Sequence, residues 1–261
     1  MKFASSIKLV FPVVIFLICW ALPQVQAQSF SVSPIKMTLK PQQNHSQQWL
    51  TVKTTGNKPV AVELSILKRE VDVDGRMFHG KDDTNNDFLI YPSQLILMPG
   101  DAQTVNIQWL GEIPTNEIIY SLVVAQVPIE INQEENTDTG TKVKIKLLTK
   151  YEGIIYIIPN AISFEVLVES ATQGMDANQS PYLELMLYNK GTIRQMINKL
   201  KLHVVPLDKN GEPVGESIVY MPEMPKEVIK QSLYAKQRRR CLLPWPNGVP
   251  VGPVKVSVEN R

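Results

Sequence analysis

The sequence predicts an all-β protein built from two β-sandwich domains, and three observations support this. In most apolar segments, apolar residues alternate with polar ones at a period of two, which is the pattern of half-buried strands. Turn sequences rich in Gly and Pro separate these segments, as at Asp74-Gly75, Pro99-Gly100 and Asn210-Gly211. The chain has no convincing long amphipathic helix, and its best candidate is residues 226–235.

The first 27 residues have the pattern of a secretory leader. Lys2 and Lys8 give a positively charged start before an apolar run over residues 9–22. Val25-Gln26-Ala27 then has the small-residue pattern that a signal peptidase recognises. The run is short for a spanning helix, which needs roughly 20 apolar residues. We therefore expect residues 1–27 to be removed and an exported, soluble product to remain.

The predicted mature chain has a balanced charge. The full sequence of 261 residues carries 27 Lys and Arg against 25 Asp and Glu, and the leader removes two of the lysines. A chain with equal numbers of basic and acidic residues gives no electrostatic reason to expect nucleic acid as a partner. Its length of 234 residues suits two domains that each bury their own core.

Alternation and apolar runs locate the individual strands, and the middle of the chain divides them into two groups. The boundary is expected near Pro159-Asn160, with a first sandwich over residues 28–160 and a second over residues 161–261. The predicted strands include residues 60–66, 105–109, 120–127, 143–147, 162–168, 182–188, 199–205 and 254–258.

Several ordered segments resemble the periplasmic chaperones of the chaperone–usher pilus pathway. They are Phe30–Leu39, Tyr91–Val105, Ser121–Pro128 and Thr141–Pro159, followed by Tyr182–Leu202. Two departures suggest a divergent branch: Asn106 stands where many members carry arginine, and residues 150–159 are about two residues longer than the commonest pattern.

The resemblance implies two immunoglobulin-like sandwiches set at an angle, in the periplasm, with no enzymatic activity and no cofactor. Its implied partners are incomplete pilus subunits and an outer-membrane usher. Such a chaperone lends a β-strand to a subunit that lacks one, so that backbone hydrogen bonds give affinity and alternate side chains fill the subunit's apolar groove.

The segment Thr141–Leu147 has the pattern that strand donation requires. Val143, Ile145 and Leu147 alternate with lysines, and lysine on the opposite face protects an edge strand from indiscriminate pairing. The same pattern also fits an ordinary sandwich strand whose apolar face lies in its own core. The position after the loop at residues 130–140 favours the donor interpretation.

The resemblance also implies a basic anchor for the carboxylate at the subunit's C-terminus. Lys36 matches the position of the first anchor, and Lys150 is the nearest basic residue to the second. The strictly aligned positions for the second anchor are Glu152 or Ile154, neither of which binds an anion, so a solvated surface charge is an equal alternative for Lys150.

The remaining reactive residues do not form a recognisable catalytic or metal-binding set. Cys241, the one cysteine beyond the leader, is expected to pack as a small apolar side chain. His45, His79 and His203 lack ligand spacing, and a hairpin turn explains Asp72–Gly75 better than a calcium loop does. The basic run Lys236–Arg240 is expected to be a solvated loop.

Two other functions remain open from the sequence. An adhesin-like surface or secreted recognition module would use the loops of the same sandwiches, and it would not co-purify with an incomplete subunit. A hydrolase or metal carrier is disfavoured because no suitable residue set is found.

Overall fold

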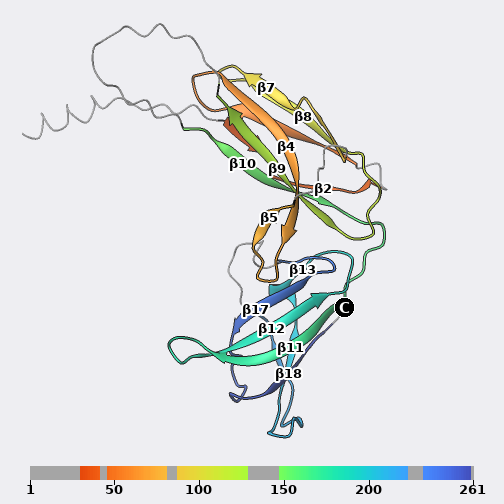
Figure 1. The fold of residues 1–261 in the computed structure, drawn as a ribbon, viewed down its shortest axis with the longest axis vertical. Coiled ribbons are helices and arrows are strands. Elements are labelled where there is room, and N and C mark those ends of the chain that lie inside the picture. Colours follow the sequence, from red (N-terminus) through yellow and green to blue (C-terminus); the bar gives the residue numbers. More distant parts are fainter. Residues whose placement is uncertain (1–29, 42–45, 81–86, 129–146, 223–231, 260–261) are drawn as a thin grey trace, which may run out of the picture.

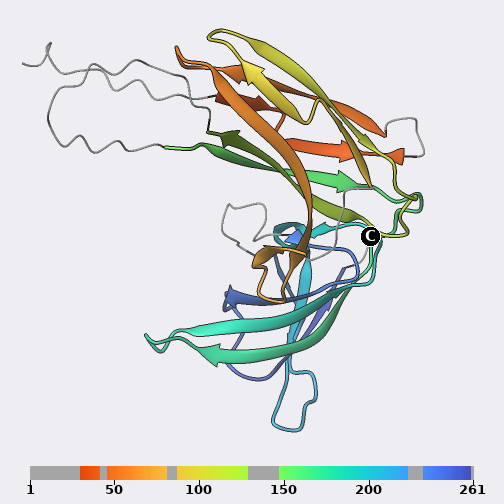
Figure 2. The same ribbon diagram turned by 45° about the horizontal axis from the view of Figure 1, so that its top comes forward.

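A computed structural model describes residues 30–41, 46–80, 87–128, 147–222 and 232–259. These residues form two β-structured domains that meet at an angle (Figures 1 and 2). The predicted leader, residues 42–45 and 81–86, and most of the predicted donor segment lie outside the described residues. Within the described ranges, no helix is long and apolar enough to cross a membrane.

The first domain is a sandwich of two sheets. The smaller sheet has the order β1-β3-β8-β6, and the larger has the order β2-β10-β9-β4-β5, with β7 also paired to β4. The strands are β1 (Phe30–Ser33), β2 (Lys36–Leu39), β3 (Gln47–Thr54), β4 (Val60–Val71), β5 (Met77–His79), β6 (Phe88–Tyr91), β7 (Gln94–Leu97), β8 (Ala102–Trp109), β9 (Ile118–Val127) and β10 (Lys150–Ile157).

Alternation along the strands builds the core of the first domain. In β3, Leu50 and Val52 are fully buried while Trp49 and Thr51 are exposed, and β8 buries Val105 and Ile107 against them. The inward faces of both sheets share one apolar cluster, which fixes the register because a slip of one residue would turn every apolar side chain outward.

The second domain has three smaller sheets with the orders β11-β12-β17, β15-β14-β18 and β13-β16. Its strands are β11 (Val166–Met175), β12 (Pro181–Asn189), β13 (Gln195–Met196), β14 (Leu202–Pro206), β15 (Ile218–Tyr220), β16 (Ser232–Leu233), β17 (Arg238–Pro244) and β18 (Val254–Val258). A separate apolar cluster holds them together. The expected domain boundary at residues 160–161 lies between β10 and β11.

Several predicted elements are confirmed. The strands expected at residues 60–66, 105–109, 120–127, 182–188 and 254–258 are present, and the three turn glycines Gly75, Gly100 and Gly211 have positive φ. Cys241 is 2% exposed, and burial raises the pKa of its thiol to about 11. A buried, protonated thiol fits the packing role expected for it.

Several predictions about secondary structure need correction. Residues 162–165 are not a strand, because the carbonyls of Ser163 and Glu165 accept N–H donors from residues 190–192 in an irregular connection. Residues 197–199 form a short 3₁₀ turn, closed by the Leu200 N–H on the Ile197 carbonyl, and β14 begins only at Leu202. The opening segment Phe30–Leu39, for which no strand bounds were predicted, forms β1 and β2 in different sheets.

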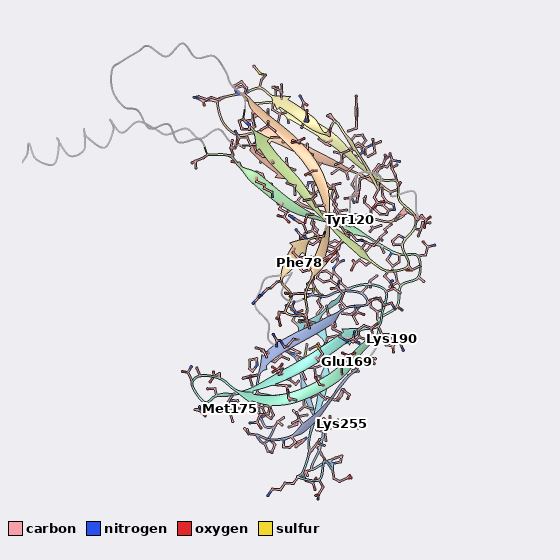
Figure 3. The ribbon with its side chains drawn as sticks, viewed as in Figure 1. Phe78, Tyr120, Glu169, Met175, Lys190 and Lys255 are labelled. Atoms are coloured by element: carbon pink, nitrogen blue, oxygen red, sulfur yellow. The ribbon has the colours of Figure 1, made fainter. Side chains whose placement is uncertain are left out.

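The last correction concerns the two segments near the C-terminus. Ser232–Leu233, inside the best helix candidate, is a strand paired with β13. The end of the predicted basic loop, Arg238–Arg240, belongs to β17. Because side chains alternate along the strand, Arg239 points inward and is 5% exposed. Arg238 points outward and pairs with Glu169 at 2.8 Å (Glu169 is labelled in Figure 3).

Candidate functional site

The outer face of the larger sheet of the first domain looks toward the second domain (Figure 2). Alternation in β10 sends Ile155 and Ile157 into the core and leaves Glu152, Ile154 and Tyr156 on the outer face. We call this face, together with the segments of the second domain that contact it, the junction.

A salt bridge crosses the junction. The Glu117 carboxylate, just before β9, pairs with the Arg194 guanidinium, and the Arg194 backbone N–H donates to Glu117 Oε2 at 2.9 Å. The Glu117 side chain is 1% exposed and that of Arg194 is 21% exposed. Burial raises the pKa of Glu117 above the usual carboxyl range, although Arg194 opposes the shift. The pair therefore places a desolvated carboxylate against a partly hydrated cation.

Aromatic side chains surround this salt bridge. The Arg194 guanidinium lies 3.6 Å from the centre of the Tyr156 ring, an arrangement in which a cation is attracted to the ring face. Tyr156 and Ile119 of the first domain pack with Tyr234 of the second in one buried cluster. Burial raises the pKa of Tyr234 to about 12, so the phenol stays neutral. The junction thus has an apolar centre and is more than a flexible linker.

A hairpin makes the second contact between the domains. The turn between β4 and β5 reaches β17, where the Asp74 carboxylate pairs with Arg240 at 2.6 Å and the Val73 carbonyl accepts the Arg240 N–H. In Figure 3, Phe78 of this hairpin lies between the first domain and the strands of the second. At Gly75, with φ of +77°, a Cβ atom would lie 1.1 Å from Arg239 Nη1. Any larger residue would have to displace the Arg239 guanidinium, and the positive φ also favours glycine.

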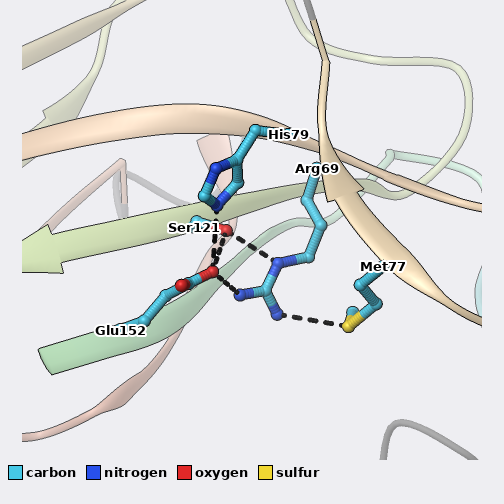
Figure 4. A network of polar contacts seen from close by, with 5 residues as sticks. All are labelled: Arg69, Met77, His79, Ser121 and Glu152. Carbon is cyan, nitrogen blue, oxygen red and sulfur yellow. Dashed lines mark hydrogen bonds and ion pairs between the residues drawn. The ribbon is translucent and has the colours of Figure 1, made fainter.

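A polar network occupies the outer face of β4, β5, β9 and β10 (Figure 4). Arg69, whose side chain is 6% exposed, donates to Ser121 Oγ at 2.7 Å and to Glu152 Oε1 at 2.6 Å. Ser121 Oγ and His79 Nε2 also contact Glu152 Oε1, at 2.9 and 3.0 Å. Partial burial alone would raise the pKa of Glu152, but hydrogen bonds from His79, Ser121 and Arg69 lower it to about 2. The network holds a carboxylate ionised and ties β5 to β10.

Lys36, the first predicted anchor, lies at the start of β2 on the junction side. It is exposed, with its Nζ 5.5 Å from the centre of the Tyr156 ring, and it forms no ion pair with a described residue. In the parallel pairing of β2 and β10, Lys36 lies directly opposite Ile154. Lys36 lies near enough to the Glu117 carboxylate to lower the pKa of that group, and its exposed ammonium is still accessible to a further anionic group.

Lys150, the second predicted anchor, is also exposed but lies at the other end of β10. It is four residues before Ile154, so it is about 13 Å further along the strand from the residue opposite Lys36. The structure does not bring the two lysines together. The aligned alternatives lie closer to Lys36, but Ile154 is apolar and Glu152 is an anion already paired with Arg69.

The predicted donor segment is described only at its last residue. Val143 and Ile145 lie outside the described residues, and Leu147 has 78% of its surface exposed. Downstream, β10 pairs with β9 over its whole length but with β2 only from Ile154 to Ile157. Among the described residues, the edge of β10 before Ile154 that faces away from β9 is unpaired.

Sequence reasoning missed the residues that build the junction. Glu117 and Arg194 are 77 positions apart, and neither belongs to a motif. Arg69 is a basic residue within an otherwise alternating strand, which is the one sequence signal that could have marked it. An arginine at a buried strand position requires an acidic or polar partner.

Comparison with known proteins bears on the fold. No family model matches the sequence, and no curated protein matches it closely. Solved structures do match: a chain from the structure of a chaperone–tip adhesin complex of CFA/I fimbriae biogenesis is 14% identical, with a TM-score of 0.53. That match covers 88% of this chain and 98% of the other.

A second structure gives the same result. The class 5 fimbriae chaperone CfaA is 14% identical with a TM-score of 0.52, and the match covers 88% of this chain and all of CfaA. Similarity at this level of identity establishes a shared fold. It confirms the all-β architecture of two sandwiches set at an angle that the sequence and the resemblance predicted.

Proposed function

We propose that the chain is a periplasmic chaperone that binds incomplete pilus subunits by strand donation and delivers them to an outer-membrane usher. The observation that carries the proposal is the open edge of β10 before Ile154, which directly follows the Thr141–Leu147 segment. A strand with one free edge can pair with a strand of another chain, and such pairing is one of the recurring modes of peptide recognition.

Charge at the junction supports the same proposal. Lys36 is an exposed cation that forms no ion pair within the described residues, although it acts on the nearby Glu117 carboxylate. It lies on β2, the strand that closes the other half of the β10 edge. A subunit strand that runs along β10 toward Ile154 would bring its C-terminal carboxylate to this lysine. We therefore assign Lys36 as the carboxylate anchor and leave Lys150 as an auxiliary contact at the far end of the strand.

The fold adds support because it is shared with fimbrial chaperones over 98–100% of their chains. The two domains are held at their angle by the Glu117–Arg194 salt bridge and by the hairpin contact of Asp74 with Arg240. A fixed angle keeps Lys36 and the β10 edge in one orientation, and such preorganisation reduces the entropy lost on binding.

The deciding experiment is co-expression in the periplasm with subunits from the fimbrial genes of the same host. The chaperone should co-purify with a subunit in a one-to-one complex. The matched control is the same subunit with its missing strand fused back at its end, which should not bind because its groove is filled. Equal capture of both forms would contradict strand donation and favour adhesin-like recognition.

A further inference from the structure

The smaller sheet of the first domain carries a row of side chains that the proposed chaperone function does not use. Trp49 on β3 and Tyr91 on β6 both lie directly opposite Asn106 on β8. Residues directly opposite each other on antiparallel strands point to the same face of the sheet. Trp49 and Tyr91 are 58% and 72% exposed, so two large rings face solvent on either side of an amide.

Polar, uncharged side chains flank this aromatic row, together with Leu89, which is 43% exposed and lies opposite Gln108. Gln47 and Gln108 lie on one side of it, and Thr51 and Thr104 lie on the other. None of these four side chains has a hydrogen-bond partner among the described residues. Between the rings, the Asn106 Oδ1 is buried and also has no partner within the described ranges. The face thus offers aromatic surface together with side-chain donors and acceptors that are not engaged within the described residues.

We propose that this face binds a β-1,4-linked glycan. Trp49 and Tyr91 are separated by two inter-strand steps, or about 10 Å, which is about the length of one disaccharide repeat in an extended β-1,4 chain. Two rings at this spacing stack on every second sugar. The amides and hydroxyls between them can donate to and accept from the sugar hydroxyl or N-acetyl groups.

The near absence of charge on this face favours a neutral glycan over a nucleic acid. A single-stranded nucleic acid would also stack on aromatic rings, but it requires a basic groove along its phosphates. The outer face of β3, β8 and β6 carries one charge among its described residues, Lys53 at one end. A neutral polymer is complementary to such a surface. The face lies on the smaller sheet and β10 on the larger, so glycan binding leaves the proposed subunit site open.

The test is calorimetric titration of the full mature chain with chitohexaose, cellohexaose and maltohexaose. Both β-1,4-linked hexamers should bind, and the α-linked maltohexaose, which coils, should not. Stronger binding of chitohexaose than of cellohexaose would mean that the amides contact N-acetyl groups, and either order supports the proposal. Trp49→Ala and Tyr91→Ala should each weaken binding at least tenfold without changing the melting temperature.

The matched control is Ile96→Ala, which removes a side chain of similar exposure (66%) from β7 on the other sheet and should bind like wild type. The proposal is overturned if neither β-linked hexamer binds at millimolar concentration, or if maltohexaose binds equally well. It is also overturned if Trp49→Ala binds like wild type. Concentration-dependent dimerisation that Trp49→Ala abolishes would assign the face to a second copy of the chain instead.

Discussion

Glu117 and Arg194 form a salt bridge across the junction in which the two partners differ in their access to water: their side chains are 1% and 21% exposed. This difference predicts unequal costs for removing either charge. Arg194→Met leaves a fully buried carboxylate without its counterion, which costs about 3–5 kcal/mol. Glu117→Gln leaves an arginine that can still reach solvent, and it should cost less.

The measurement is the free energy of unfolding from urea titration at pH 7 for the two variants and the double variant. Arg194→Met should be the less stable single variant, and the double variant should recover part of the loss because no buried charge remains unpaired. Equal losses, or a larger loss for Glu117→Gln, would show that the carboxylate is not the desolvated partner.

Gly75 provides a second test of the junction. Gly75→Ala places a Cβ atom on the Arg239 guanidinium, whereas Gly100→Ala, with a similar φ of +86°, meets no atom within 4 Å. Both variants pay about 1–2 kcal/mol for a left-handed backbone, and only the first must also displace Arg239. Gly75→Ala should therefore unfold at a clearly lower urea concentration than Gly100→Ala, and identical midpoints would contradict the close contact.

The Glu152 network predicts a pH dependence of stability. The folded-state pKa of Glu152, about 2, is below its ordinary value of 4.5. The unfolded state therefore takes up the proton first as pH falls. The stabilisation is fully present above about pH 5 and is lost as the pH falls to about 2. Glu152→Gln should be less stable than wild type at pH 7, and the difference in urea midpoint should shrink toward pH 2. A difference that does not change with pH would rule out the ionised carboxylate as its source.

Much of the first domain could be predicted from its sequence because its strands are half buried. The alternation in β4 and β8 reports which face meets the core, and glycine marks the turns that need positive φ. The second domain was less predictable where backbone partners are irregular, as at Ser163 and Leu200. Such connections depend on tertiary contacts that leave no periodic signal.

The junction was the least predictable region. Arg194 contacts Glu117, which is 77 residues away in the sequence, and Arg240 contacts Asp74, which is 166 residues away. Each residue alone resembles an ordinary surface charge, and only the folded arrangement gives it a partner. The loop prediction for Lys236–Arg240 is wrong for its last three residues, because Arg238–Arg240 follow the period-two alternation of β17.

The Lys36 anchor predicts a binding defect without a folding defect. Lys36 is exposed, forms no ion pair within the described residues and acts on the Glu117 carboxylate only as the last of several causes, so Lys36→Ala should change the melting temperature little. A hydrogen bond to a charged group contributes about 1.5–3 kcal/mol. Its loss should weaken subunit binding about tenfold to a hundredfold. Lys36→Arg should retain binding, and Lys150→Ala should have a smaller effect because that side chain lies about 13 Å further along β10. Wild-type affinity of Lys36→Ala would refute the anchor.

The donor segment gives the last prediction, which separates the two interpretations of Thr141–Leu147. If Ile145 fills a subunit groove, Ile145→Asp places a charge in an apolar pocket of the partner and leaves the chaperone's own core intact. Subunit capture should be lost while circular dichroism and the melting temperature stay at wild-type values. If Ile145 instead belongs to the chaperone's own sandwich, the same change buries a carboxylate, and the protein itself should be destabilised by several kcal/mol.

Lys144→Ala is the matched control, because in a strand the sequence alternation would put Lys144 on the face opposite to Ile145. It should bind subunits like wild type, apart from a greater tendency to aggregate once a charge that protects the edge is removed. Both variants are compared with wild type at matched periplasmic levels by co-purification. An unfolded Ile145→Asp would refute the donor assignment. A folded variant that still captures subunits would show that the strand contributes backbone pairing without filling the groove at this position.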